Sequence, residues 1–520
     1  MTTRTHVGLD YPDQPLHQFL RDAADRHGER VGLLIDSQQL TFADLDAGGT
    51  KFANVLARLG FGLGQRAVLA SGNRPEWLMS QHGVSQTGGS SVLVNSSWRE
   101  GELAHAFAIT RPTAVIADLA MALRLDASSL ALPPVRVCLD DEAPPGWRSF
   151  SDVVSDASAR RPPDLDVDLS RLEALLPFSS GTTGLPKAVR HSHRSLVAAA
   201  LQRITSYGIT DSDRLQFFMP LFTIYGVIVA TSVFASGASL RLFARFDPKV
   251  VLQNVEDERI TIAFGAAPVA VALRDQPDLE RYDLSSLRYM MWGATPVIHD
   301  VAQEVTKRSG IRWFVAYATT ESGISANPIE RPEAWRLDSP GLPLPDVELR
   351  VVDGESLRDV APGQTGEIVV RSPSQMMGYL PEEADAEAFI PGGWLRTGDI
   401  GWVEPEGWIH LTDRSKEMMK VSGFQVAPAE IEQVLFAHPS IADCAVFGVP
   451  DPRRGEVPKA AVVVVPGDTL SAAEVVAYVA DRLATYKHVR TVSFVDEIPR
   501  NAGGKVLRRL LRAADLPAAP

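Results

Sequence analysis

The chain has 520 residues, of which 45% are hydrophobic and 22% are charged, and its formal net charge is −13. This length excludes a single small module and is enough for several domains with a large apolar core. The acidic excess is spread along the chain, which argues against nucleic acid or an anionic membrane surface as the main partner.

The cysteines and the apolar stretches bear on the compartment of the protein. Cys138 and Cys444 are the only cysteines and lie far apart, so they predict neither a disulfide framework nor a cysteine metal site. Residues 1–30 carry charges throughout and have no apolar core of the signal-peptide type. Residues 215–240 lack charges, but a proline, a glycine and several hydroxyl residues interrupt them. We therefore expect a strand, a loop and a buried helix there, in a cytoplasmic protein.

Strand-like and helix-like stretches alternate in the first part of the chain. Apolar runs predict strands over 33–36, 67–70, 91–94 and 114–117. Helical patterns predict helices over 42–59, 75–86 and 99–109. Thr41 is expected to cap the first of these helices and Gly60 to end it. Such alternation is typical of a mostly parallel sheet covered by helices, and residues 140–168, rich in Pro, Asp and Ser, predict a connection.

The same alternation returns over 172–316 and then gives way to other patterns. Strands are predicted over 240–243, 261–264, 287–291 and 313–315. After the proline-rich stretch 331–345, short strands over 348–352, 367–370 and 408–411 predict a small antiparallel subdomain. Beyond residue 413, helices are predicted over 428–437, 471–483 and 506–513, and strands over 442–449, 460–465 and 492–495.

The expected fold is therefore α/β with two domains. The large N-terminal domain, 1–412, contains two helix-covered, mostly parallel sheets over 1–168 and 169–330 and the antiparallel subdomain over 331–412. A small α+β domain follows over 413–520.

A stretch between a predicted strand and a predicted helix has the composition of a phosphate-binding loop. Its residues are Ser179, Ser180, Gly181, Thr182, Thr183, Gly184, Leu185, Pro186 and Lys187. The hydroxyls donate hydrogen bonds without adding charge, the glycines let backbone amides approach an anion, and the lysine supplies a positive charge. Pro186 before the lysine and Ala188 after it exclude a Walker loop. An ordinary hydroxyl-rich turn remains the alternative, although it leaves the Gly-Leu-Pro-Lys ending unexplained.

The stretch resembles the phosphate-binding signature of the adenylate-forming family, which includes acyl-CoA synthetases, 4-coumarate:CoA ligases, peptide-synthetase adenylation domains and firefly luciferase. Further segments match the family's signatures in the same order, over 293–296, 317–321, 397–399, 413–417, 421–426 and 499–505. The resemblance covers nearly the whole chain and is greatest to the 4-coumarate and acyl-CoA ligase branch.

The resemblance implies sites for ATP or AMP, for Mg²⁺ and for the acid. The family's catalytic positions correspond to Thr183, Lys187, Glu321 and Lys505. Lys505 would bridge the substrate carboxylate and the α-phosphate, and Glu321 would hold Mg²⁺. The other positions implied to bind the nucleotide are Gly293, Ala294, Thr295, Tyr317, Thr320, Asp399 and Arg414.

The resemblance also implies a mobile C-terminal domain. Lys416 matches the pivot about which that domain turns between two orientations, one for each half-reaction. Gly423 matches the glycine that lines the tunnel for the pantetheine arm of coenzyme A.

The acyl pocket is implied by Phe222, Thr223 and Tyr225, and here the chain departs from the family. Thr223 replaces the usual histidine, which opens one wall of the pocket, and the absence of an aspartate at this position argues against an amino-acid substrate. Ala318 replaces a glycine, and Trp292 stands where a small residue is usual. We expect these two larger residues to slow adenylation, unless Trp292 turns into the core on the other side of its strand.

The expected activity is that of an AMP-forming acid:CoA ligase acting on a bulky, largely apolar acid. The open alternatives are an enzyme that processes a ready-made acyl-adenylate, a ligase that loads a carrier protein, and a non-catalytic nucleotide-binding module. The expected partners are an acid or acyl-adenylate and coenzyme A, without nucleic acid or membrane. His191 and His193 are not expected to bind a metal, because an extended chain directs them to opposite sides.

Overall fold

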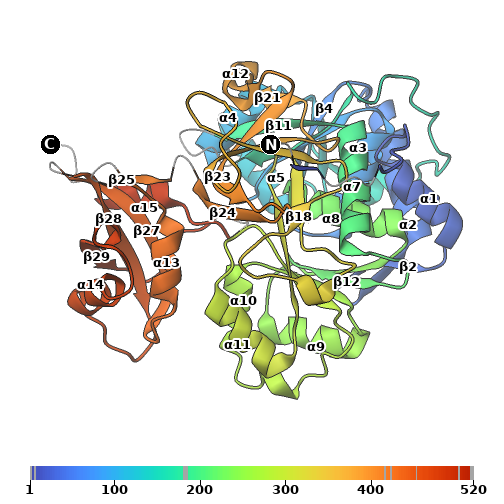
Figure 1. The fold of residues 1–520 in the computed structure, drawn as a ribbon. Helices are drawn as coiled ribbons and strands as arrows, with labels where there is room; N and C mark the ends of the chain where they lie inside the picture. The colour runs from blue at the N-terminus through green and yellow to red at the C-terminus, as the bar shows by residue number, and fades with distance from the viewer. Residues whose placement is uncertain are drawn as a thin grey trace.

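The computed structural model describes residues 3–4, 8–179, 186–414, 417–421, 424–451, 454–501 and 504–515. The fold is α/β, with a large N-terminal domain of mixed sheets, a small antiparallel sheet and a C-terminal domain (Figure 1). This confirms the expected fold class.

The first mixed sheet has nine strands in the order β10-β11-β9-β5-β4-β6-β7-β8, with β21 paired to β11. Its strands are β4 (Arg66–Ala70), β5 (Ser90–Leu93), β6 (Ala114–Ala117), β7 (Val135–Cys138), β8 (Arg148–Ser149), β9 (Glu173–Leu176), β10 (Phe178–Ser179), β11 (Lys187–Ser192) and β21 (Gly378–Leu380). The run from β9 to β8 is parallel, while β11 is antiparallel to its neighbours. All four residues of β5 and of β6 are buried, as expected for strands covered on both faces.

The second mixed sheet also has nine strands, in the order β18-β17-β16-β15-β14-β12-β13-β2-β3. They are β2 (Val31–Ile35), β3 (Gln38–Thr41), β12 (Arg214–Phe217), β13 (Ser239–Leu242), β14 (Ile262–Gly265), β15 (Tyr289–Trp292), β16 (Trp313–Ala318), β17 (Gly323–Ala326) and β18 (Leu342–Pro343). The strands from β16 to β2 are parallel.

We expected one sheet to be formed by residues 1–168 and the other by residues 169–330. The structure differs, because each sheet contains strands from both stretches. Strands β2 and β3, from the first stretch, complete the second sheet, and β9, β10 and β11, from the second stretch, complete the first. Pairing between parallel strands joins residues far apart in the chain, so local patterns do not reveal which sheet a strand enters.

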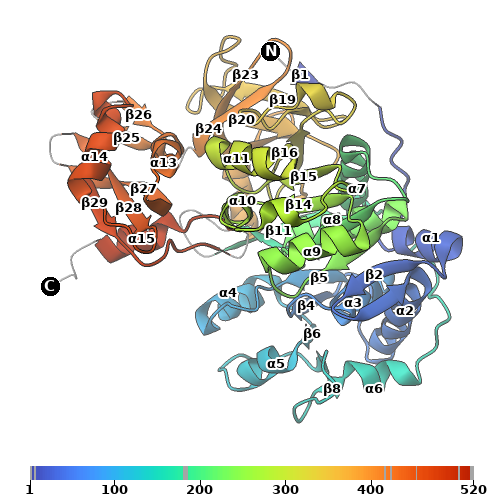
Figure 2. The same cartoon turned by 90° about the horizontal axis from the view of Figure 1, so that it is seen from below.

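Helices cover both sheets. They are α1 (Gln18–His27), α2 (Phe42–Arg58), α3 (Pro75–Gln86), α4 (Glu100–Thr110), α5 (Leu119–Asp126), α6 (Phe150–Ser155), α7 (His193–Tyr207), α8 (Ile224–Ser236), α9 (Pro248–Glu258), α10 (Ala267–Arg274) and α11 (His299–Ser309), with 3₁₀ turns η1 (Leu279–Arg281) and η2 (Pro332–Ala334). Figure 2 shows α4 and α5 beside the first sheet and α9 to α11 beside the second. The uncharged stretch forms β12, a loop and the buried helix α8, as predicted. None of the described helices is long and apolar enough to cross a membrane.

The antiparallel sheet and the C-terminal domain complete the chain. The sheet contains β1 (Thr3–Arg4), β19 (Glu348–Val352), β20 (Gly366–Arg371), β22 (Phe389–Ile390), β23 (Trp394–Val403) and β24 (Ile409–Arg414), with η3 (Glu382–Ala384) and α12 (Asp385–Ala388) nearby. The C-terminal domain has its own apolar core and contains β25 (Met419–Val421), β26 (Phe424–Val426), β27 (Ile441–Asp451), β28 (Gly455–Val464), β29 (Thr491–Phe494), α13 (Pro428–Phe436), α14 (Ala472–Ala480), η4 (Thr485–Lys487) and α15 (Arg508–Asp515).

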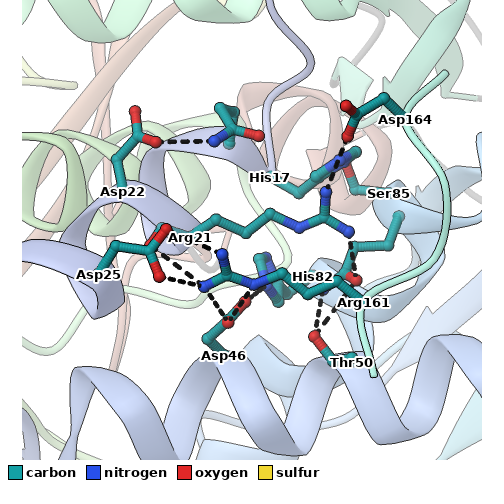
Figure 3. A network of polar contacts seen from close by, with 12 residues as sticks. His17, Arg21, Asp22, Asp25, Asp46, Thr50, His82, Ser85, Arg161 and Asp164 are labelled. Atoms are coloured by element: carbon teal, nitrogen blue, oxygen red, sulfur yellow. Dashed lines mark hydrogen bonds and ion pairs between the residues drawn. The ribbon is translucent and has the colours of Figure 1, made fainter. Parts of the chain in front are cut away.

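A network of polar contacts links the loop after α6, which contains Arg161, to helices α1, α2 and α3 (Figure 3). The Arg161 guanidinium donates to Asp25 on α1 at 2.8 Å and to Asp46 on α2 at 2.8 Å. Asp46 also lies 2.9 Å from His82 Nε2 on α3. Because His82 is buried, its pKa lies below the ordinary value, although Asp46 opposes this shift. The network joins three helices and a loop into one unit.

Candidate active site

A cavity of about 660 Å³ lies at the carboxyl ends of β15 and β16 and is lined by residues of both domains. In a sheet of parallel strands, this end is where ligands bind. The N-terminal domain contributes mainly apolar and small residues to the lining, with Glu102, His191 and Arg203 among them. The C-terminal domain contributes Glu417 and residues around Lys505. The cavity therefore lies where the two domains meet.

Near the cavity, but not among its lining residues, a cation and a carboxylate lie around one aromatic ring. Lys187 begins β11, and its Nζ lies 5.1 Å from the centre of the Tyr379 ring. The Tyr379 hydroxyl donates to Glu321 Oε1 at 2.8 Å. Ser179 lines the cavity, whereas Ser180, Gly181, Thr182, Thr183 and Gly184 lie outside the described residues. The three described side chains can hold an anion and a cation close to each other.

A tight turn follows β16 and presents Thr320 to the cavity. Thr319 Oγ1 accepts hydrogen bonds from the backbone amides of Glu321 and Ser322, each at 3.2 Å. His191 Nε2 lies 2.9 Å from the Thr320 carbonyl oxygen, which fixes the turn from the side of the first sheet. Burial lowers the pKa of His191 to about 4, so the ring is neutral at pH 7 and donates to this carbonyl. His191 is thus a structural support of the turn.

The segment after β15 is held in a strained turn. The Thr295 amide donates to the Gly293 carbonyl at 2.8 Å, and Ala294 between them has a φ of +64°. A γ-turn with positive φ is rare, and such strain is found mainly at functional sites. Thr295 Oγ1 accepts a hydrogen bond from the Ala267 amide at the start of α10, at 2.8 Å. Gly293 and Ala294 line the cavity, and Thr295 anchors them from behind.

The long strand β23 meets β16 beside the cavity. The Tyr317 hydroxyl donates to Asp399 Oδ2, and Tyr317 lines the cavity. The Asp399 amide donates to Thr397 Oγ1 at 3.0 Å, across Gly398, whose φ of +70° favours glycine. In the antiparallel pair β23–β24, Arg414 stands directly opposite Asp399. The register thus brings together the two positions predicted to hold the ribose, although the Arg414 side chain lies outside the described part.

The apolar end is lined by Phe222, Tyr225 and Met291. Thr223 also lines it, and its Oγ1 accepts from the Gly226 amide at 3.1 Å and so caps α8. The short Thr223 side chain is thus hydrogen-bonded to the backbone of α8, and this wall of the cavity lacks the imidazole ring of the histidine that is usual in the family. The Tyr225 hydroxyl lies 3.5 Å from Met291 Sδ, and burial raises the Tyr225 pKa well above its ordinary value. This end of the cavity suits a large apolar group.

Two predicted pocket residues have different outcomes. Ala318 is exposed and lines the cavity. Trp292 does not line it: its indole is fully buried and lies 5.0 Å from the Trp313 ring, centre to centre. The prediction of Trp292 as a pocket residue is therefore wrong. Successive residues of a strand point to opposite faces, so Met291 points to the cavity and Trp292 into the core.

The C-terminal domain brings Lys505 to the cavity. Lys505 lines it, and its Nζ lies 3.7 Å from Glu417 Oε1. The Lys505 amide donates to Asn501 Oδ1 at 2.9 Å. Gly504 faces Pro268 on α10, since a side chain at this position would come within 3.6 Å of Pro268. Lys416 and Gly423 lie outside the described residues.

The sequence did not point to two residues of the site, Tyr379 and Arg203. Tyr379 belongs to β21, a strand of three residues that joins the first sheet at β11. Arg203 lies in the amphipathic pattern of α7 and lines the cavity. Nothing in their local sequence distinguishes them, because their role depends on pairings formed by the whole fold.

Known proteins are similar to this chain over most of its length. A model described as AMP-binding enzyme matches residues 20–380, and a model described as AMP-binding enzyme C-terminal domain matches residues 430–505. The 4-coumarate–CoA ligase 4 of Arabidopsis thaliana is 33% identical over 491 residues, which are 91% of this chain and 86% of the relative.

Solved structures of the same overall fold match almost the entire chain. The anthranilate CoA ligase AuaEII, in complex with anthranoyl-AMP, superimposes with a TM-score of 0.89 at 25% identity, over 97% of this chain and 98% of its own. The amide bond synthetase McbA from Marinactinospora thermotolerans superimposes with a TM-score of 0.84 at 29% identity, over 96% of this chain and 100% of its own.

Proposed function

The chain belongs to the AMP-binding enzyme family, and from this premise we propose that it joins a bulky, largely apolar carboxylic acid to coenzyme A. The coarser activity, an ATP-dependent and AMP-forming acid:CoA ligation through an acyl-adenylate, is that of the family and of its 4-coumarate ligase relatives. ATP, AMP and coenzyme A are accordingly substrates or products. The proposal adds the class of acid and the roles of individual residues.

One observation carries the assignment of residue roles: Lys505 lines the same cavity as the Thr320 turn and the apolar wall at Phe222. These residues come from different domains and meet where an acid carboxylate and an α-phosphate would react. A lysine aimed at the developing charge is the usual form of electrostatic catalysis in such a step.

In the proposed first half-reaction, the acid carboxylate attacks the α-phosphate of ATP and pyrophosphate leaves. Lys505 stabilises the negative charge shared by the carboxylate and the α-phosphate. Lys187, the Thr320 hydroxyl and the predicted loop residues, Thr183 among them, hold the phosphates. Tyr317 packs on the adenine. Asp399, oriented by the Tyr317 hydroxyl, accepts hydrogen bonds from the ribose hydroxyls, and Arg414 donates to the ribose oxygens.

The donor set is compatible with Mg²⁺ bound at Glu321. Mg²⁺ commonly takes one or two carboxylates, with water and phosphate oxygens completing its shell. Glu321 supplies one such carboxylate, and the phosphates of ATP and water would supply the other ligands. When bound, Mg²⁺ neutralises charge on the phosphates.

In the proposed second half-reaction, the thiol of coenzyme A attacks the acyl carbon and AMP leaves. The C-terminal domain turns about Lys416, so that Lys505 withdraws and the Gly423 backbone lines the thiol's approach. The alternative acceptor is a carrier protein in place of free coenzyme A.

The proposed compartment is the cytoplasm, a choice supported by Cys138 and Cys444 being free and buried.

The preference for a bulky acid is supported by the open wall at Thr223. Apolar surface removed from water contributes about 25 cal/mol per Å², so a small acid such as acetate would leave much of this energy unused. The acids in the names of two similar proteins, 4-coumarate and anthranilate, are both aromatic.

The test is a panel of aromatic, fatty and polycyclic acids with ATP, followed by mass spectrometry. Pyrophosphate exchange reports the first half-reaction, and coenzyme A, a holo carrier protein and a simple amine are compared as acceptors. Supplying a synthetic acyl-adenylate separates an enzyme that has lost adenylation. Thioester formed from free coenzyme A and a bulky acid supports the proposal, whereas efficient use of acetate alone would contradict it.

A further inference from the structure

Arg203 is the single lysine or arginine that the described part of the N-terminal domain contributes to the cavity lining. It lies on α7, next to the apolar end. Its guanidinium carbon lies 5.2 Å from the centre of the Tyr207 ring and 5.4 Å from that of Tyr225. Two aromatic rings thus hold a positive charge at the wall of the acyl pocket.

Two nitrogens of this guanidinium have no hydrogen-bond partner among the residues that the structure describes. Arg203 Nε and Nη1 are both buried, and no residue in the described part of the chain accepts a hydrogen bond from either. No described carboxylate forms an ion pair with Arg203, in contrast to Arg508, which binds Glu417 and Glu432. Burial of unpaired donors of this kind is strongly unfavourable.

The two tyrosines do not remove this need. An aromatic ring interacts with the face of a guanidinium or with its charge, while the N–H donors lie in the plane and point outward. Tyr207 and Tyr225 therefore fix the orientation of Arg203 and leave its donors for another group.

The position of Arg203 separates it from the phosphates. His193 begins α7 just after His191, the support of the Thr320 turn, and Arg203 follows ten residues later. At 1.5 Å per residue this is roughly 15 Å along the helix axis. Arg203 thus belongs to the end of the cavity that Tyr225 and Met291 line, where the body of the acid would lie.

We propose that Arg203 is an anion-binding subsite and that the acid has a second carboxylate, at the end away from the one that is adenylated. The planar fork of arginine matches a carboxylate with two parallel hydrogen bonds. The preferred substrate then has an apolar middle and two acidic ends. This inference rests on the proposed function, because it refines the class of acid for the same site.

Matched pairs of acids test the subsite. The pairs are 3-phenylpropionate with 3-(4-carboxyphenyl)propionate, hexanoate with adipate and octanoate with suberate. Arg203→Met removes the charge and keeps much of the length, Arg203→Lys keeps the charge without the fork, and Arg194→Met is the control, an exposed arginine on the same helix.

We expect kcat/KM of the wild type to be at least about 30-fold higher for the diacid in at least one pair, the scale for losing one partner of a buried charge pair. Arg203→Met should abolish this preference, so that kcat/KM for the diacid falls to that for the monoacid of the same pair. Arg203→Lys should recover part of it, and Arg194→Met should behave as wild type. Equal use of both acids in every pair, unchanged by Arg203→Met, would overturn the proposal.

Calorimetric binding of the same acids distinguishes this failure from failure of the proposed function. If no acid is turned over but a diacid binds more tightly than its monoacid, and only when Arg203 is present, the ligase proposal fails and the subsite stands. If thioesters form and no pair shows a difference that depends on Arg203, the subsite fails and the ligase proposal stands.

Discussion

Lys505 is the residue on which the proposed chemistry depends most. Its Nζ lies 3.7 Å from Glu417 Oε1, in a cavity that opens on the Thr320 turn. A lysine placed where charge develops contributes to the transition state and little to binding of the ground state. Its removal should therefore affect one half-reaction selectively.

Lys505→Ala should raise the barrier to adenylation by about 2.7 to 4 kcal/mol, the range for one preorganised donor. Thioester formation from a supplied acyl-adenylate should continue at the wild-type rate. Lys487→Ala, which removes a lysine paired with Glu430 outside the cavity lining, is the control. Pyrophosphate exchange and thioester formation are measured separately, and an equal loss in both would exclude the assigned role.

Thr223 sets the size of the acyl pocket in this account. Thr223→His should lower kcat/KM for bulky acids about tenfold or more relative to a short acid, because added volume in a packed wall costs about 1 to 3 kcal/mol. Thr223→Ser keeps the hydroxyl that caps α8 and should behave as wild type. Competition between a long and a short acid, followed by mass spectrometry, gives the ratio. A ratio unchanged by the imidazole would contradict the role of this wall.

Some residues of the site could be predicted from the sequence, and others could not. The contacts of Tyr317, Thr320 and Lys505 arise at positions that their motifs indicated. Trp292 could not be assigned, because one residue of register in β15 decides between cavity and core. Arg203 and Tyr379 could not be found, since their partners lie on other elements and no local spacing relates them.

Among the elements, helices and central strands were largely predictable. The predicted helix over 75–86 coincides with α3, and Thr41 caps α2 as expected, through Asp44. Short strands such as β10 and β21 were missed, because two or three residues carry no periodicity. The exchange of β2 and β9 between sheets was also missed, and it is this exchange that joins the two halves of the N-terminal domain.

The segment between β24 and β25 is the element predicted to change conformation between the half-reactions. Proline fixes φ and restricts the residue before it, so Lys416→Pro should prevent rotation of the C-terminal domain. One half-reaction should fail and the other persist, as measured by pyrophosphate exchange and by thioester formation from supplied adenylate. Lys416→Ala leaves the backbone free and should retain both. Wild-type rates for both steps in the proline variant would locate the hinge elsewhere.

At the scale of the whole molecule, buried histidines make stability depend on pH. Burial lowers the pKa of His191 and His193 to about 4 and lowers those of His17 and His82 as well. Between about pH 6.5 and pH 4 the unfolded chain takes up protons that the folded chain does not bind. The free energy of unfolding should therefore decrease as the pH is lowered through this window, by about 1.4 kcal/mol per pH unit for each of His191 and His193. The lowered pKa values of His17 and His82 act in the same direction.

The midpoint of thermal unfolding, followed from pH 7 to pH 5, reports this loss. His193→Asn removes one titrating ring and keeps an acceptor for the Leu16 amide, which donates to His193 Nδ1. This variant should show a shallower decline than the wild type. A midpoint that stays constant or rises toward pH 5 would contradict the neutral state of these histidines.

The central claim is that this chain couples ATP cleavage to thioester formation through an acyl-adenylate. Its most direct test is a single incubation of the full chain with ATP, Mg²⁺, coenzyme A and the acid panel, in which all products are quantified by mass spectrometry. The account predicts one AMP and one pyrophosphate for each acyl-CoA, with a bulky acid preferred. Formation of ADP and phosphate, or a thioester that appears without ATP, would contradict it.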